Sequence, residues 1–136
     1  MLKWTTCYVT IKSTHGKYLT AEDNGQVNAN GNGIGTWEVW AVMFHENNVL
    51  SLRGAHQKYL GAEPWGEAHA KFEEAYSGNL VFFTLEDWGN GLFAFKAYTG
   101  KYLVAESNGA LNANTNAVHS WETFQILPAP IGKLSC

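Results

Sequence analysis

Three glutamates stand at the same place in a stretch that the chain contains three times. The stretches read GKYLTAEDNGQVNAN at residues 16–30, QKYLGAEPWGEAHAK at 57–71 and GKYLVAESNGALNAN at 100–114. The shared acidic residues are Glu22, Glu63 and Glu106. A carboxylate accepts hydrogen bonds from hydroxyl groups, so the same acceptor is offered at three related places. A glutamate at the end of a strand can also bond the N–H groups of a turn, which is a purely structural role.

Aromatic residues supply a second kind of group suited to ligand binding. Trp4, His45 and Trp88 stand at corresponding places in the three copies. Trp88 and Trp65 are each followed by glycine in a turn-like stretch, which predicts exposed side chains. An exposed indole stacks on the C–H face of a sugar ring, while nearby carboxylates bind its hydroxyls. The candidate carbohydrate-binding residues are Trp4, Glu22, His45, Glu63, Trp65, Trp88 and Glu106.

The same residues predict how such sites would behave. Three glutamates at related places predict up to three sites, so a polymer that engages several of them would be held more tightly than a short oligosaccharide. His45 takes the place that tryptophan has in the other two copies. We therefore expect the middle site to differ in strength and to respond to pH near the ordinary histidine pKa of about 6.5.

The elements that must position these residues are strands. A short apolar run, a glycine-bearing turn and a second short run predict a hairpin in each copy. A strand with alternating apolar and polar residues is predicted before each hairpin, as in the run YVTIK. The repeated leucines and alanines, such as Leu19 and Ala21, are expected in the core. An aromatic-rich strand closes each copy, and its Trp37, Leu80 and Trp121 are also expected in the core.

The chain is therefore predicted to be all-β and to bury its core in a closed barrel. Its 136 residues suffice for one domain. We place that domain at residues 1–127, with copies at about 4–43, 44–86 and 87–127. Residues 128–136, with two prolines and no periodicity, are expected to be a tail or linker. The two cysteines, Cys7 and Cys136, allow a disulfide, but we favour one buried thiol and one terminal thiol.

Several function classes are disfavoured. No nucleophile motif or metal-ligand spacing is present, so we expect no enzyme, no metal and no cofactor. The formal net charge is −3 and most of the nine basic residues are spread over the copies, which argues against nucleic acid. The same lack of a clustered basic face weakens binding to an acidic filament. No run of apolar residues is long enough to span a membrane.

The recurrent G-K-Y-L-x-A-E-x-x-G-x-V pattern, followed by W-E-x-F or W-E-x-W, resembles the fascin-type β-trefoil domain from Tyr8 to about Leu127. The resemblance implies three pseudo-symmetric repeats of four strands. Six strands would form a short barrel, and six would form three hairpins that cap one end of it. Fascin-like trefoils occur in actin-bundling proteins, and also as carbohydrate-binding modules of bacterial glucan-degrading enzymes.

We therefore expect a monomeric, non-catalytic module that binds β-glucan or a related polysaccharide. Actin-filament binding is the alternative, and a bare interaction scaffold comes third. Under the first hypothesis the protein would be secreted as a module of a larger extracellular enzyme. Under the actin hypothesis it would be cytoplasmic.

Overall fold

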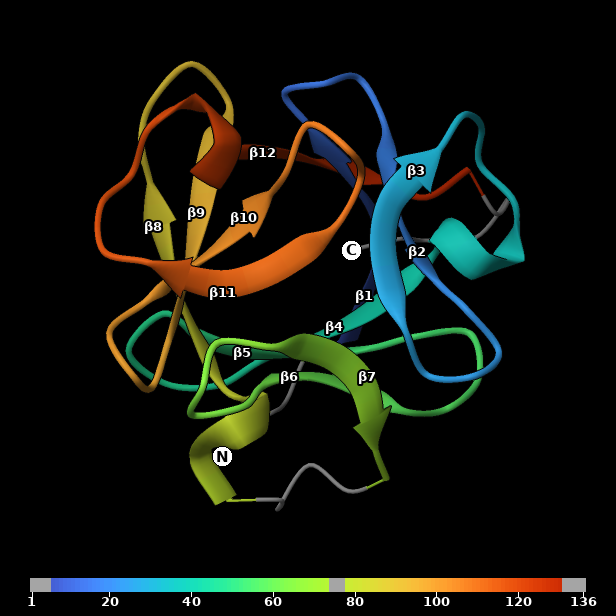
Figure 1. The fold of residues 1–136 in the computed structure, drawn as a ribbon. Coiled ribbons are helices and arrows are strands. Elements are labelled where there is room, and N and C mark those ends of the chain that lie inside the picture. Colours follow the sequence, from blue (N-terminus) through green and yellow to red (C-terminus); the bar gives the residue numbers. More distant parts are fainter. Residues whose placement is uncertain (1–5, 74–77, 131–136) are drawn as a thin grey trace.

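The structure is a computed structural model that describes residues 6–73 and 78–130. Within these residues the chain forms twelve strands and three short 3-10 turns (Figure 1). The strands are β1 (Thr6–Ser13), β2 (Tyr18–Ala21), β3 (Val27–Gly31), β4 (Trp40–Phe44), β5 (Val49–Arg53), β6 (Tyr59–Ala62), β7 (Ala68–Phe72), β8 (Phe83–Asp87), β9 (Leu92–Ala97), β10 (Tyr102–Ala105), β11 (Leu111–Thr115) and β12 (Phe124–Pro128). The 3-10 turns are η1 (Thr36–Glu38), η2 (Gly78–Val81) and η3 (Ser120–Glu122).

Six of the strands close into an antiparallel barrel. Around the ring the order is β1, β4, β5, β8, β9 and β12, and β12 pairs again with β1. Closure pairs every barrel strand on both sides, so the barrel has no open edge. Its interior is filled by large side chains with no exposed surface, among them Ile11, Trp40, Leu52, Phe83, Phe95 and Phe124.

The other six strands form three hairpins, β2–β3, β6–β7 and β10–β11, which lie together in front of the barrel in Figure 1. The turn of each hairpin contacts the second strand of another hairpin, so that the three form a ring. The contacts are the 2.8 Å hydrogen bonds from the N–H groups of Ala29, Ala70 and Ala113 to the carbonyl oxygens of Gly109, Gly25 and Gly66. All three glycines have a positive φ, which explains why glycine occupies these turns.

The all-β prediction is confirmed, but the prediction of three pseudo-symmetric repeats of four strands is wrong. The twelve strands belong to one connected sheet, and the barrel pairs strands across the expected repeat boundaries, such as β4 with β5 and β12 with β1. The barrel pairings are also unequal, since β5 and β8 match at two positions while β8 and β9 match at five. The physical reason is that barrel strands satisfy their backbone N–H and C=O groups on both neighbours. No group of four strands is therefore self-contained.

The W-E motifs do not begin the closing strands, as the sequence pattern predicted. They form η1 and η3, because Glu38 and Glu122 reach back to accept the N–H groups of Gly35 and His119, each at 2.8 Å. The closing strands start only afterwards, with β4 and β12. Trp37 is 37% exposed, and its counterpart in η3 is similarly exposed, so the prediction that these tryptophans belong to the core is wrong.

The two ends of the described chain lie side by side. β12 runs to Pro128, and the N–H of the buried Ala129 donates to the carbonyl oxygen of Tyr8 at 2.9 Å. Cys7 is buried, as predicted, but it is disulfide-bonded, so its interpretation as a free thiol is wrong. The sequence contains one other cysteine, Cys136, which lies outside the described residues.

Candidate functional site

Each of the three repeated glutamates makes hydrogen bonds within its own hairpin. Each half-buried carboxylate is hydrogen-bonded to a side chain of the strand that follows the turn. The partners are Asn28 at 2.7 Å from Glu22, His69 at 2.6 Å from Glu63 and Asn112 at 3.4 Å from Glu106. Each glutamate also donates its backbone N–H across the hairpin at 2.8 Å. These carboxylates therefore have a structural role, through side chains of the returning strand and not through the turn N–H groups that the sequence analysis considered.

Trp65 is the most exposed large apolar side chain among the described residues, at 72%. It lies at the tip of the β6–β7 hairpin, and its indole N–H donates to Glu67 at 3.1 Å. The corresponding turns carry Asn24 and Asn108, whose side-chain oxygens accept backbone N–H groups two residues further on. The corresponding turns form without a tryptophan, so the turn itself does not require Trp65. The prediction that the Trp65 side chain is exposed is confirmed.

Trp88 is 52% exposed, which confirms the prediction that this side chain faces solvent. It follows β8, and its indole N–H donates to Glu86 at 3.1 Å. The same carboxylate accepts the phenolic hydroxyl of Tyr102 at 3.0 Å. Burial, together with the hydrogen bond to Glu86 and its charge, raises the pKa of Tyr102 above the ordinary value of 10.0. Trp88 is therefore held in one orientation by a carboxylate that is itself fixed.

The predicted aromatic row does not lie beside the glutamates. β9 begins just after the turn that carries Trp88, and it ends where the chain enters the β10–β11 hairpin. Trp88 therefore lies at the barrel end away from the hairpins, and so does His45 in the β4–β5 turn. With six residues in β9, about 20 Å of strand separates the two ends. Of the predicted residues, Trp65 and Glu63 share one turn, and Trp4 lies outside the described residues.

His45 is half-buried in the β4–β5 turn. Its Nε2 lies 3.1 Å from the Ser51 hydroxyl, and its ring meets Phe82 edge-on at 5.1 Å. Desolvation by this burial lowers the pKa of His45 from its ordinary value of 6.5. Burial therefore favours the neutral form of this imidazole.

The lowered pKa of His45 predicts a loss of stability in mild acid. As pH falls through about 6.5, the unfolded chain takes up a proton at this histidine before the folded chain does. The unfolding temperature should therefore fall between pH 7.5 and the lower pKa of the folded state. His45→Gln keeps a hydrogen-bonding group near Ser51 but does not titrate, so its unfolding temperature should vary less across that range. Equal slopes for the two proteins in a calorimetric pH series would contradict this assignment.

Two histidines that the sequence analysis did not single out join neighbouring parts of the chain. His56 packs edge-on against Trp37 at 4.9 Å, and its Nε2 lies 3.0 Å from the carbonyl oxygen of Ala21. His15 makes the matching contacts with Trp121, at 5.2 Å, and with a carbonyl oxygen of β10. Because a carbonyl oxygen only accepts, Nε2 carries the proton in both rings. These contacts explain why the two tryptophans are half covered without being core.

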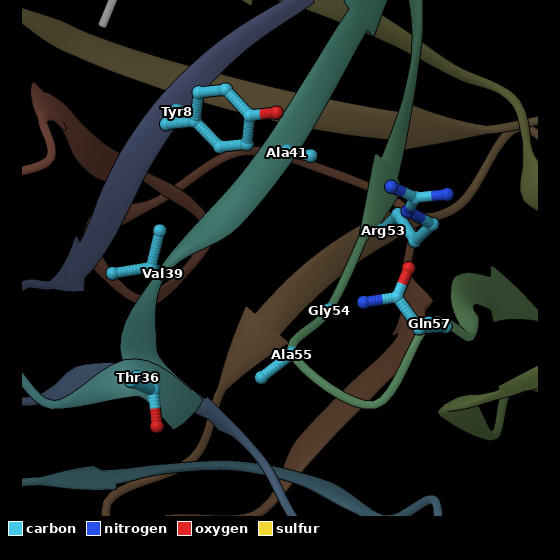
Figure 2. Close-up of a pocket in the computed structure, with 8 residues that line it drawn as sticks. All are labelled: Tyr8, Thr36, Val39, Ala41, Arg53, Gly54, Ala55 and Gln57. Carbon is cyan, nitrogen blue, oxygen red and sulfur yellow. The ribbon is translucent and has the colours of Figure 1, made fainter. Parts of the chain in front are cut away.

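A groove that the sequence analysis missed runs along the outer face of β4. Its central hollow, of about 280 Å³, opens between β1, β4 and β5, with Tyr8 on one side of Ala41 and Arg53 on the other (Figure 2). Hollows of about 230 and 160 Å³ adjoin it at either end and share lining residues with it. We call the three together the β4 groove and define it by Tyr8, Val39, Ala41, Met43, Arg53 and Tyr59.

The β4 groove exists because a small residue lies between two long ones. Ala41 is directly opposite Tyr8 on β1 and Arg53 on β5, so all three side chains point outward in one row. The corresponding places in β8 and β12 carry the longer side chains of Thr84 and Gln125, and Gln125 lines a separate hollow of about 290 Å³ with Lys12 and Leu92. In the sequence, only this alanine indicates the groove. It can be interpreted in this way only when the strand register shows which residues lie opposite it.

Among residues 6–73 and 78–130, no group of three or more histidine, cysteine or acidic side chains is arranged to hold a metal ion. No helix within these residues is long and apolar enough to cross a membrane. In a comparison with protein families, the model of the FRG1-like domain matches residues 2–85. That domain has a fascin-like, β-trefoil-like fold. The match therefore supports a resemblance to fascin-like domains, and it gives no support for a resemblance to carbohydrate-binding modules.

Proposed function

Because the chain belongs to the FRG1-like domain family, we propose that it binds actin filaments as a monomer and catalyses no reaction. The family match is the observation that carries the proposal, since it agrees with a fascin-like domain and fascin-like domains occur in actin-bundling proteins. The three glutamates, which were the main argument for sugar binding, have partners within their own hairpins. This leaves the actin hypothesis better supported than the carbohydrate hypothesis.

The hairpin end of the molecule carries several lysines that suit local contacts with an acidic filament. Lys17, Lys58, Lys71 and Lys101 lie in the hairpins or in the turns that lead into them. The same hairpins carry the acidic residues Glu22, Asp23, Glu63, Glu67 and Glu106, while at the opposite end the β4–β5 turn carries Glu46 and β8 ends at Asp87. Among its described residues the hairpin end has no excess of positive charge, so the placement of the filament contact there rests on its exposed tryptophan.

Trp65 is the most exposed large apolar side chain at the hairpin end among the described residues. Interface energy is concentrated in a few anchors, and tryptophan is the residue most enriched among them. The hydrogen bond to Glu67 holds the indole in place, so little rotamer freedom is lost on docking. We therefore place Trp65 at the centre of the contact, with the surrounding lysines at its rim.

A pull-down that compares two ligands tests the proposal. The protein is mixed with filamentous actin in one arm and with insoluble β-glucan in the other, at identical salt, and the pelleted fraction is measured. We expect the protein to pellet with actin in a saturable way and to stay in the supernatant with glucan. Retention on glucan alone would establish the second candidate, and no retention in either arm would reject both.

Carbohydrate binding is the second candidate, and two observations favour it. Trp65 presents an open indole face with Glu63 and Glu67 nearby, which is the combination that a sugar ring requires. The disulfide at Cys7 is typical of proteins from oxidising compartments, where a secreted polysaccharide-binding module would work and a cytoplasmic actin binder would not. On this hypothesis the structure supports one site at the β6–β7 turn, whereas the sequence predicted up to three.

A further inference from the structure

Among the described residues that line the β4 groove, Arg53 is the one that is charged. Its half-buried side chain makes no hydrogen bond or ion pair with any other described residue. The matching basic residues of β1 and β9 are placed differently, because Lys12 and Lys96 lie over the rings of Tyr18 and Tyr102 at 5.5 and 5.9 Å. Arg53 therefore presents its planar set of donors to the groove, where a carboxylate fits them in a two-point contact.

The rest of the groove is apolar and elongated. Ala41 and Met43 are alternate residues of β4, and Val39, whose backbone is extended, continues the same row just before the strand begins. At a rise of about 3.3 Å per residue they span roughly 13 Å, which suits several residues of an extended chain rather than one compact molecule. Ile34 and Pro130 lie at one end of the groove and Tyr59 at the other.

We propose that the β4 groove binds an extended peptide segment of a partner protein. The segment contains an acidic residue, with one apolar residue two positions before it and another two positions after it. Alternate side chains of an extended peptide have the same spacing as Val39, Ala41 and Met43. The acidic side chain then enters the central hollow beside Ala41 and bonds Arg53, while the two apolar side chains occupy the outer hollows. β4 is already paired on both sides, so the peptide is recognised through side chains and not by adding a strand.

Among the hollows of the residues that the structure covers, the β4 groove combines an apolar row with a basic side chain that has no partner. At the corresponding place in β12, Gln125 lines a separate hollow of about 290 Å³ with Lys12 and Leu92, but there the basic side chain lies over the ring of Tyr18. This provides matched variants. Ala41→Gln puts a longer side chain between Tyr8 and Arg53, so it should obstruct the central hollow, and β12 carries glutamine at the same position, so the barrel should still fold. Lys96→Ala removes a comparable basic side chain outside the groove. The inference does not depend on filament binding, which we place at the hairpin end.

Selection from a displayed library of random heptapeptides tests the inference. The wild-type protein is the bait, and Ala41→Gln is used to remove peptides that bind elsewhere. We expect the enriched peptides to share an aspartate or glutamate with apolar residues two positions before and after it. A synthetic peptide with that sequence should lose about tenfold or more in affinity on Arg53→Ala, as loss of a charged hydrogen bond predicts, and should keep its affinity on Lys96→Ala.

A double-substitution cycle shows whether Arg53 is the partner of the acidic side chain. Replacing the peptide's glutamate by glutamine should weaken binding to the wild type and leave binding to Arg53→Ala unchanged. The inference is overturned if no peptide prefers the wild type to Ala41→Gln, or if the enriched peptides lack an acidic residue. It is equally overturned if Arg53→Ala and Lys96→Ala behave alike while circular dichroism shows both variants folded.

Discussion

Replacing Trp40 with alanine is expected to lower the free energy of unfolding by about 3–5 kcal/mol, the usual cost of removing a buried tryptophan. Trp40 has no exposed surface and is the largest of the fully buried side chains. Its indole N–H donates to the carbonyl oxygen of Leu19 at 3.1 Å, so it also connects the barrel to the first hairpin. Chemical denaturation followed by fluorescence or circular dichroism gives the value.

Trp40→Phe is the matched control, because Phe83 and Phe124 begin the corresponding strands β8 and β12 and are equally buried. A phenyl ring keeps much of the packing but leaves the Leu19 carbonyl oxygen without its donor. We expect a loss of about 1–2 kcal/mol. If Trp40→Ala unfolded at the same denaturant concentration as the wild type, the assignment of this side chain to the barrel interior would be wrong.

Trp65→Asn is expected to weaken filament binding by about 30-fold, which is the loss typical of a central interface tryptophan. Asparagine is chosen because Asn24 and Asn108 occupy the corresponding turns, where their side chains support the backbone. The β6–β7 turn should therefore form as before, and the unfolding midpoint should not change. Cosedimentation with filaments over a range of filament concentrations measures the loss.

Trp88→His supplies the control for Trp65→Asn. It removes another exposed tryptophan that is also hydrogen-bonded to a glutamate, but at the opposite end of the barrel, and it installs the residue type of His45. Its filament affinity should equal that of the wild type. Equal losses for the two variants would mean that exposed indoles bind the filament without specificity, and a loss for Trp88→His alone would place the contact at the other end.

Local features of the fold could be predicted from the sequence because they depend on neighbouring residues. The hairpins followed from apolar runs separated by glycine turns, and the exposure of Trp65 and Trp88 followed from their turn settings. The place of Trp37 could not be predicted in this way. Its burial depends on Glu38 capping the 3-10 turn and on His56, which comes from a distant part of the chain.

The candidate sites needed the three-dimensional arrangement. Glu22 and its counterparts were recognised as repeated carboxylates, but their partners on the returning strand were not, because a side-chain contact depends on strand register. The β4 groove depends on register in the same way, since Ala41 is informative only once Tyr8 and Arg53 are known to lie opposite it. The end of the barrel at which a given residue lies also depends on the order in which the strands pair.

Amide hydrogen exchange of the wild-type protein, measured with and without a saturating concentration of filamentous actin, tests the central claim most directly. We predict slower exchange on the filament in the β6–β7 turn around Trp65 and in the neighbouring β10–β11 hairpin, whose Ala113 N–H bonds Gly66. Exchange in the β8–β9 turn should not change. Filament-dependent protection confined to the β8–β9 turn, or no protection anywhere, would contradict the account.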